Sequence, residues 1–429
     1  MKEKEFVINT RLFEDYMERM NFLNEVSIIN PNAISFGSGR PDKAFFDVKE
    51  IIANFHSYAQ MHVSSEEQLE DFYNDLGQYN KTNGIITDTI ARLLANDENI
   101  KADSEDIIVT IGGQEGMAIV INGIFESDND VLLISDPSYI GFVGYAKIYG
   151  TPIVPIDRDE NSVCLDHLET TIKKLIKQGK NPKVFYEVPD FHNPTGTYMP
   201  LEKRKGLIEL AEKYNFFIVE DNPYSYFLYD GEKIPTLKAL DKYRRVIHLG
   251  SFAKTIFPSL RLGYLVVDQS FNYKGRRVRL VEEFKKVKSY ISVNTSTLLQ
   301  AMVGSYLRKQ DYSFKKSCAR KVDMCRKKRD AMIEALESHF PGMEAVQWNK
   351  PVGGFFLSMT VPFVITNEFL QECVQDYRVI FCPMSFFYLN EEVGARQMRL
   401  AFSNLSPETI REGIDRLAKF IKSKMQPKF

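Results

Sequence analysis

The sequence has few of the residues that build metal centres and disulfide frameworks. Its 429 residues include only five cysteines and six histidines. The histidines form no H-x-x-x-H or similar pair, and the cysteines are widely scattered: Cys164, Cys318, Cys325, Cys373 and Cys382. We therefore expect free thiols in a reducing compartment and no metal site.

Long apolar runs and an excess of one charge are also missing. No run approaches the roughly 20 apolar residues that span a bilayer, and the N-terminal segment MKEKEFVIN lacks the apolar core of a signal peptide. The formal net charge of −2 argues against a general role at nucleic acids or membrane surfaces. We expect a cytoplasmic protein that binds neither nucleic acid nor a membrane.

One basic stretch departs from this balance. Its members are Lys315, Lys316, Arg320, Lys321, Arg326, Lys327, Lys328 and Arg329. Apolar residues recur between these charges at helical spacing. The stretch is therefore predicted to be the solvent-exposed face of a long helix over about residues 311–340, rather than a nucleic-acid site.

The sequence does contain a regular alternation of short apolar segments and helical segments between about residues 85 and 305. The apolar segments predict seven strands, at residues 107–111, 131–134, 152–155, 183–188, 216–220, 245–249 and 263–267. Strands that alternate with helices predict an α/β fold with a mostly parallel sheet covered by helices on both faces.

After residue 305 the pattern changes. The long charged helix is followed by short strands near residues 354–361, 379–382 and 397–402 and by a last helix near 407–424. We predict a large domain over residues 46–305 and a smaller α+β domain over 306–429. Residues 1–45 are predicted to be an N-terminal arm that forms part of the small domain.

Lys254 is the first candidate functional residue. It lies in GSFAKTIFPSLRLG (residues 250–263), between two strongly apolar segments. A lysine held among buried strands must be paired, neutralised or used chemically, whereas a loop lysine simply reaches water. Ser251 and Arg261 flank it, and a hydroxyl and a guanidinium both suit a phosphate.

Other polar residues follow predicted strands at the sheet edge where ligands bind in α/β folds. The glycines of TIGGQEG (residues 110–116), which include Gly113 before Gln114, let backbone N–H groups approach an anion. Tyr139 in DPSY could stack on a flat ligand. Taken alone, each feature is better explained by an ordinary turn or by a packing tyrosine.

Three further motifs carry side chains suited to ligand binding. Asn193 in PDFHNPTG could donate to a ligand oxygen or stabilise its own turn. Asp221 follows the apolar run FFIV and needs a cationic or hydrogen-bonding partner, and Tyr224 lies three residues further on. Arg399 in QMRLAF could bind a carboxylate, or be an exposed strand arginine.

Together, these motifs resemble the fold-type I pyridoxal-phosphate enzymes of the class I/II aminotransferase family. SFAKTIFPSLRLG, NPTG and D-x-x-Y carry the resemblance, which runs from about Ser35 to the last helix. GSGRPD (residues 37–42) and GQY (77–79) are similar to the kynurenine/aminoadipate aminotransferase-like group and to the aminotransferase-like domain of GntR-type regulators. The resemblance implies pyridoxal 5'-phosphate, a homodimer, and a ping-pong exchange between an amino acid and a 2-oxo acid.

The resemblance also implies roles for the candidate residues. Lys254 would form a Schiff base with the cofactor and move a proton at the substrate carbon. Asp221 would pair with the ring nitrogen and keep it protonated. Asn193 and Tyr224 would hydrogen-bond the phenolic oxygen of the ring, and Tyr139 would stack on the ring.

The remaining residues would bind the two anionic groups of cofactor and substrate. The phosphate would be held by Gly113, Gln114, Ser251, Arg261 and, from a second subunit, Tyr79. The substrate α-carboxylate would be held by Arg399, Asn193 and the backbone near Gly39. The sequence departs from the family at Gly113, where serine or alanine is frequent, and at His192, where glutamine is frequent.

Two alternatives use the same cofactor. The motifs are compatible with a lyase, cyclase or oxidase on the same fold. A cofactor-sensing regulator would need a DNA-binding domain, and the residues before Ser35 contain no basic helix-turn-helix.

Tyr226, Phe355 and Phe356 could shape a pocket for an aromatic or long-chain amino acid, although core packing explains them equally well.

Overall fold

The structure, a computed structural model, describes residues 8–425. The first seven residues of the predicted N-terminal arm and residues 426–429 lie outside it. A seven-stranded sheet forms the centre of the molecule, in the order β2-β8-β7-β6-β5-β3-β4. Its strands are β2 (Ile107–Thr110), β3 (Asp130–Asp136), β4 (Ile153–Asp157), β5 (Asn181–Glu187), β6 (Phe217–Asp221), β7 (Val246–Ser251) and β8 (Gly263–Val266).

The sheet is mostly parallel, which confirms the predicted fold class. Only β8 runs antiparallel to its neighbours β7 and β2, and the other pairs are parallel. Its strands are short and apolar because both faces are covered. The carboxyl ends of β5, β6 and β7 therefore meet at one edge of the sheet.

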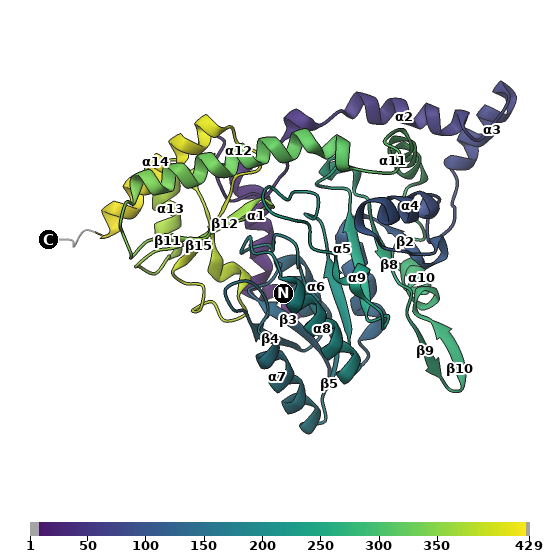
Figure 1. Ribbon diagram of the computed structural model, residues 1–429, viewed down its shortest axis with the longest axis horizontal. Helices are drawn as coiled ribbons and strands as arrows, with labels where there is room; N and C mark the ends of the chain where they lie inside the picture. The colour runs from purple at the N-terminus through teal and green to yellow at the C-terminus, as the bar shows by residue number, and fades with distance from the viewer. Residues whose placement is uncertain (1–7, 426–429) are drawn as a thin grey trace, which may run out of the picture.

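Helices cover both faces of this sheet (Figure 1). On one face, α5 (Gly112–Ile124), α6 (Ile140–Tyr149) and α10 (Leu280–Ile291) bury apolar residues against the strands. On the other face lie α7 (Leu165–Lys177) and α8 (Leu201–Tyr214). A third apolar cluster joins the β2–β8 edge to α2 (Val48–Gln60), α4 (Thr87–Glu98) and α11 (Thr297–Lys309).

A smaller antiparallel sheet lies beside the large one. Its strand order is β11-β12-β15-β14, with β11 (Gln347–Trp348), β12 (Phe356–Thr360), β15 (Gln397–Ala401) and β14 (Cys382–Pro383). Two neighbouring strands form a separate parallel pair, β1 (Ile34–Ser35) with β13 (Val379–Ile380). The predicted strand at 379–382 is thus divided between two sheets, and the N-terminal segment joins the C-terminal part of the chain.

The remaining helices connect these parts. The helix α12 (Lys315–His339) runs along the upper side of Figure 1 and packs on α14 (Pro407–Met425). The others are α1 (Glu18–Ile29), α3 (Glu66–Leu76), α9 (Leu237–Leu240) and α13 (Asn367–Asp376). The hairpin of β9 (Ser270–Tyr273) and β10 (Arg276–Arg279), which the sequence pattern did not predict, extends from the lower right of Figure 1. The domain boundaries at residues 45 and 305 stay predictions.

The prediction that α12 exposes all of its basic residues is wrong for Lys328 and Arg329. Their exposed fractions are 1% and 8%. The Nζ of Lys328 lies 2.6 Å from Oδ2 of Asp42 and donates to the carbonyl of Ser403 at 2.8 Å. Periodicity could not reveal this, because both partners lie far from α12 in the sequence.

Candidate active site

A cavity of about 240 Å³ opens at the carboxyl ends of the central strands. Every predicted site residue except Tyr79 lines it: Gly39, Gly113, Gln114, Tyr139, Asn193, Asp221, Tyr224, Ser251, Lys254, Arg261 and Arg399. Tyr79 lies in the segment between α3 and α4 with 78% of its surface exposed. The fold therefore gathers residues from seven separate regions of the sequence around one cavity.

Lys254 lies three residues beyond the end of β7. Its Nζ donates a hydrogen bond to the carbonyl of Gly39 at 3.0 Å. Burial, followed by the nearby guanidinium groups of Arg399 and Arg261, lowers the pKa of this amine to about 8. Lys254 is thus a half-buried amine that lines the cavity and binds a backbone carbonyl, unlike a loop lysine that simply reaches water.

Asp221 is the last residue of β6 and is 7% exposed. Burial raises the pKa of its carboxyl group to about 6, while the hydrogen bond from the Tyr186 hydroxyl and the charge of Lys254 oppose that rise. The Tyr186 oxygen lies 2.7 Å from Oδ2. The carboxyl group is therefore ionised at neutral pH, although its charge is less well stabilised than in water. A cation beside it would stabilise that charge. Sequence reasoning missed Tyr186, which resembles any core residue of a strand.

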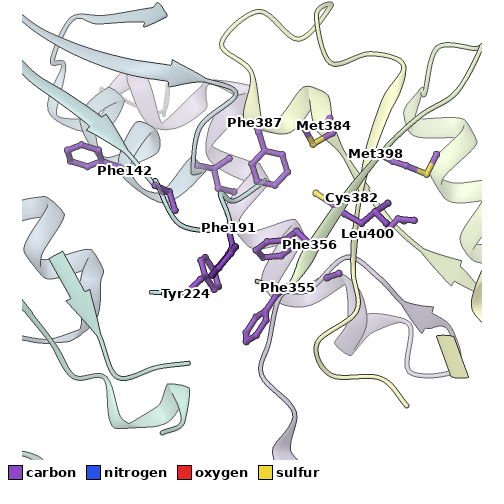
Figure 2. Packing of buried hydrophobic residues seen from close by; sticks show 14 of the residues in the cluster. Phe142, Phe191, Tyr224, Phe355, Phe356, Cys382, Met384, Phe387, Met398 and Leu400 are labelled. Atoms are coloured by element: carbon purple, nitrogen blue, oxygen red, sulfur yellow. The ribbon is translucent and has the colours of Figure 1, made fainter. Parts of the chain in front are cut away.

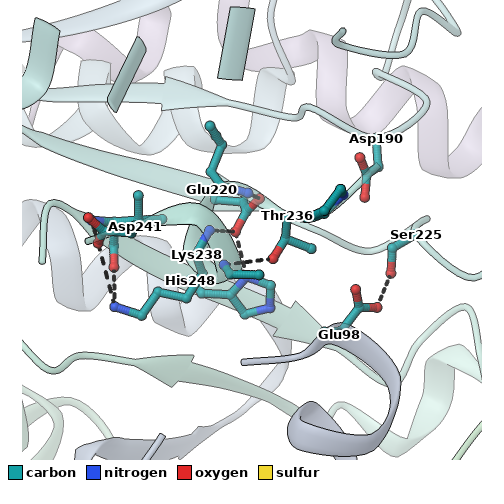
Figure 3. Close-up of polar contacts among 12 residues, drawn as sticks. Glu98, Asp190, Glu220, Ser225, Thr236, Lys238, Asp241 and His248 are labelled. Carbon is teal, nitrogen blue, oxygen red and sulfur yellow. Dashed lines mark hydrogen bonds and ion pairs between the residues drawn. The ribbon is translucent and has the colours of Figure 1, made fainter. Parts of the chain in front are cut away.

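Glu220, the neighbour of Asp221, faces the other side of the sheet because side chains alternate along a strand. Figure 3 shows its carboxylate beside His248 and Lys238. It accepts hydrogen bonds from Nδ1 of His248 at 2.8 Å and from the backbone N–H groups of Leu237 and Lys238 at 2.6 and 3.0 Å. These contacts satisfy Glu220, so Asp221 is the carboxylate that serves the cavity.

An anion-binding turn lies across the cavity, between β2 and α5. The helix α5 begins at Gly112, so Gly113 and Gln114 belong to its first turn and their N–H groups lie at the helix N-terminus. Gly112 has a φ of +66°, and a Cβ there would lie 2.5 Å from Nη2 of Arg261. Glycine thus allows the guanidinium to pack directly against the turn, and Ser251 at the end of β7 adds a hydroxyl.

Arg399 reaches the cavity from β15 of the smaller sheet and is 2% exposed. It donates to Oδ1 of Asn193 at 2.7 Å and to the carbonyl of Gly37. Its guanidinium lies 4.5 Å from the ring centroid of Phe356 and 4.8 Å from that of Phe387; both rings appear in Figure 2. Burial lowers the pKa of Arg399, but an arginine keeps its charge. The alternative of an exposed strand arginine is wrong.

Two tyrosines and one histidine complete the predicted set. Burial raises the pKa of Tyr139 to about 12 and also raises that of Tyr224, so both keep their protons at neutral pH. Gln114 approaches the Tyr139 oxygen at 3.5 Å. His192 is buried, its Nδ1 lies 2.9 Å from the Thr195 hydroxyl, and burial holds its pKa well below the usual value. His192 is a neutral residue of the turn and does not line the cavity.

The three aromatic residues suggested for the substrate pocket have different places. Phe356 lines the cavity. Phe355 packs edge-on against Tyr224, with ring centroids 5.4 Å apart. Tyr226 does not line the cavity, because its ring packs against Phe314 at 5.3 Å. That part of the suggestion is wrong, and core packing explains Tyr226.

Sequence reasoning also missed residues that come from the N-terminal segment. Met20 of α1, Ser38 and Arg40 line the cavity. A second, more apolar groove of about 420 Å³ adjoins it and shares Met20 and Gln114. Its other lining residues are Tyr16, Met17, Glu115, Ala118, Ile140, Gly141, Gly144, Tyr145 and Ile148. Nothing in the pattern of α1 indicated that it would close a site built on strands far along the chain.

Comparison with known sequences decides the family. The sequence model described as "Aminotransferase class I and II" matches residues 56–417. The chain belongs to this family. It is 39% identical to (S)-3,5-dihydroxyphenylglycine transaminase of Amycolatopsis orientalis, over 97% of this chain and 94% of that protein. It is 32% identical to aromatic-amino-acid aminotransferase 1 of Thermococcus litoralis, over 92% and 89% of the two chains.

Solved structures agree with this family and with the cofactor. The multiple substrate aminotransferase of Thermococcus profundus superposes with a TM-score of 0.82 at 30% identity, covering 98% of both chains. The α-aminoadipate aminotransferase LysN of Thermus thermophilus, complexed with N-(5'-phosphopyridoxyl)-L-leucine, gives 0.78 at 25% identity, covering 97% of this chain and 99% of that one. The protein is a pyridoxal-phosphate-dependent aminotransferase of fold type I.

The cavity suits the charges of this cofactor. Asp221 ends β6, whereas Arg261 precedes β8, two strands away in the sheet. Strands lie about 4.8 Å apart, so these opposite charges are separated by roughly 10 Å along the sheet edge. A carboxylate on one side and a guanidinium with a helix N-terminus on the other match a cationic ring nitrogen and an anionic phosphate.

Among residues 8–425, no cluster of histidine, cysteine and acidic side chains could hold a metal ion, and no helix could cross a membrane.

Proposed function

We propose that this aminotransferase exchanges an amino group between an aromatic amino acid and a 2-oxo acid, with Lys254 as the residue that holds the cofactor and moves the proton. The observation that carries this proposal is the position of Lys254, a partly desolvated amine with a pKa lowered to about 8, in one cavity with Asp221 and Arg399. A neutral amine is both a nucleophile toward an aldehyde and a base.

The bound cofactor would supply an electron sink for the electron pair left when the substrate α-carbon loses its proton. Asp221 would stabilise a proton on the ring nitrogen, because its buried carboxylate is ionised above about pH 6. Lys254 would take the proton from the substrate α-carbon and return it to a carbon of the cofactor. Asn193, Tyr139 and Tyr224 line the same cavity and would orient the ring.

Two sets of residues would fix the anionic groups. The turn at Gly113 and Gln114, with Ser251 and Arg261, would bind the phosphate. Arg399 would bind the substrate α-carboxylate, beside Asn193 and the backbone near Gly39. Holding that carboxylate fixes which bond of the α-carbon faces Lys254, which favours proton removal over loss of carbon dioxide.

The apolar groove beneath α1 supports an aromatic substrate. It adjoins the cavity at Met20 and Gln114 and is lined mainly by apolar side chains. A flat side chain bound there would bury apolar surface. Two relatives with at least 30% identity have names that refer to aromatic amino acids or dihydroxyphenylglycine.

A homodimer is part of the same proposal. Tyr79 is too exposed to serve the cavity of its own chain, so we propose that it contributes to the phosphate site of a second copy. The exposed tyrosine would then be buried at the subunit interface, which explains a 78% exposed aromatic residue on an otherwise polar segment.

A single turnover without oxygen tests the proposed reaction. The purified holoenzyme is mixed with a pool of amino acids, and mass spectrometry follows the cofactor and the products. Conversion of pyridoxal phosphate to pyridoxamine phosphate, with the oxo acid of an aromatic amino acid, is the expected result. An altered amino acid beside unchanged cofactor would instead indicate a lyase or cyclase.

Variants of the two central residues test the assignments. Lys254→Ala should abolish covalent attachment and turnover, whereas the matched change Lys321→Ala should not. Lys321 is also a partly buried lysine with a lowered pKa, but its Nζ binds the carbonyl of Thr255. Asp221→Ala should retain some cofactor and slow proton removal severely; normal turnover in either Lys254→Ala or Asp221→Ala would refute its assigned role.

A further inference from the structure

A buried ion pair lies directly behind the proposed phosphate-binding turn. Glu115 belongs to the first turn of α5, and Lys288 lies on α10. The Lys288 side chain is fully buried, that of Glu115 is 6% exposed, and Nζ lies 2.8 Å from Oε2. The motif TIGGQEG contains Glu115 but assigns it no role, and no motif of the cofactor site contains Lys288.

The pair holds the turn from both sides. Glu115 accepts a hydrogen bond from the backbone N–H of Ile111 at 2.7 Å, and Ile111 is the residue between β2 and α5. Lys288 lies 3.0 Å from the hydroxyl of Thr295, which donates to the carbonyl of Val109 at 2.9 Å. The two charges therefore fix the backbone at the end of β2 and at the start of the turn.

A second hydroxyl strengthens this network. Ser292 donates to Oε1 of Glu115 and lies 3.0 Å from Nζ of Lys288. Both side-chain partners of Glu115 thus come from α10 and the segment that follows it. A network in which every member is satisfied fixes one geometry, because any displacement leaves a buried charge or hydroxyl without its partner.

Stability alone is a poor reason for burying such a pair. Removing two charges from water is costly, and apolar residues of similar volume often stabilise a fold as well or better. A lone carboxylate so close to a phosphate site would also repel the phosphate, and Lys288 neutralises it. Both arguments indicate that the pair serves the shape of the turn.

We propose that Glu115 and Lys288 are positioning residues that hold the turn at residues 111–113 in the conformation that binds the cofactor phosphate. This inference rests on the proposed phosphate site. It assigns no direct contact with the cofactor to either residue, because Glu115 acts on the N–H of Ile111 and Lys288 acts through Glu115 and Thr295.

The test compares two ligands that differ only in the phosphate. Apoprotein is titrated with pyridoxal phosphate and with pyridoxal, and binding is followed by the absorbance of the attached cofactor. Glu115→Ala should weaken pyridoxal phosphate binding at least about tenfold, since small misplacements of binding groups have large effects. Binding of pyridoxal should change less than about threefold, because it has no phosphate to misplace.

Further variants keep the test decisive. Thr295→Val removes only the link from Lys288 to Val109 and should show the same selective loss to a smaller extent, even if Glu115→Ala does not fold. Asp268→Asn removes the negative charge that pairs with buried Lys238 near the start of β7, far from the cavity, and should leave both affinities unchanged.

The inference is tested with whichever of Glu115→Ala and Thr295→Val folds. It would be overturned if that variant lost the same affinity for pyridoxal phosphate and pyridoxal, or lost affinity for neither. The proposed phosphate site is tested separately by Arg261→Met. If that change spares the preference for pyridoxal phosphate over pyridoxal, the phosphate site itself is misassigned. If Arg261→Met removes the preference for pyridoxal phosphate while the Glu115 and Thr295 variants keep it, the phosphate site stands and only the positioning role of Glu115 and Lys288 is refuted.

Discussion

Lys254 combines two properties that a reactive lysine needs: it is withdrawn from water and it lies beside other cations. Its pKa of about 8 is below the usual value of 10.5, first because of burial and then because of Arg399 and Arg261. The protonated form is therefore disfavoured in the fold. The neutral amine becomes the main form above about pH 8 and is lost as the pH falls below that value.

This shift predicts the pH dependence of cofactor attachment. The initial rate of pyridoxal phosphate attachment to apoprotein should rise about tenfold per pH unit below pH 7.5 and level off above about pH 8.5, as expected for a group titrating near 8. Stopped-flow absorbance measures the rate. Pyridoxal should give the same midpoint, which excludes ionisation of the phosphate as the cause.

The same experiment on Arg399→Met should move the midpoint to higher pH, because one cation near Lys254 is gone. A rate that keeps rising through pH 10 in the unaltered protein would contradict the lowered pKa.

Gly113 offers a gain-of-affinity prediction. A Cβ at this position would meet only Cδ2 of Leu249, at 3.9 Å. Gly113→Ser should therefore be tolerated and should add a hydroxyl to the phosphate site. One added hydrogen bond contributes about 0.5–1.5 kcal/mol, so the affinity for pyridoxal phosphate should rise about two- to tenfold. Equilibrium titration of the apoprotein measures it.

The neighbouring glycine is the matched control. Gly112 has a φ of +66°, and its Cβ would approach Nη2 of Arg261 at 2.5 Å. Gly112→Ser should weaken cofactor binding, because the backbone is strained and the guanidinium is displaced. Equal effects of the two serines would contradict this account of the turn.

At the scale of elements, the loop at residues 37–42 depends on α12. Lys328 binds Asp42 and the carbonyl of Ser403, and the Ser403 hydroxyl donates to the carbonyl of Arg40 at 2.6 Å. The same loop supplies the carbonyl groups that accept from Lys254 and Arg399. A buried lysine on a long helix therefore fixes backbone that lines the cavity.

Lys328→Met should consequently affect substrate binding more than cofactor binding. We expect a higher KM for the amino acid, an unchanged affinity for pyridoxal phosphate, and a free energy of unfolding lower by about 1–3 kcal/mol, because Asp42 loses its partner. Steady-state kinetics and urea unfolding measure these quantities. Lys327→Met is the control, since Lys327 is exposed and pairs with Asp323 within α12; similar effects of both changes would argue against the role of Lys328.

The elements themselves were largely predictable, because buried strands of a parallel sheet are short apolar runs and ligand-binding residues follow their carboxyl ends. What escaped prediction depends on contacts between distant segments. In the sequence, Tyr186 looks like an ordinary core residue, and only the structure shows its hydroxyl beside Asp221. Lys328 looks like a surface residue, and only the structure shows it beside Asp42. Met20 lines the cavity although α1 lies far in the sequence from the strands that build it, and no local pattern encodes that packing.

At the scale of the whole molecule, the exposed Tyr79 predicts that each site needs two chains. Lys254→Ala and Tyr79→Ala chains are refolded together and assayed at limiting cofactor. A mixed dimer would have one site with both defects and one intact site, so random pairing should restore about 25% of normal activity from two inactive parents. No restoration would mean that Tyr79 acts within its own chain or not at all.

The pairing of β1 with β13 also determines when the site can form during synthesis. Ile34 hydrogen-bonds to residues around Val379, near the other end of the chain. At about 5–20 residues per second, the ribosome releases these two segments some 20–70 s apart. All seven strands of the large sheet are made in that interval, whereas β1 and the loop after it must wait for their partners. A nascent chain halted before β13 would therefore carry Lys254 and Asp221 without Arg399 and with the loop at residues 37–42 not yet held in place.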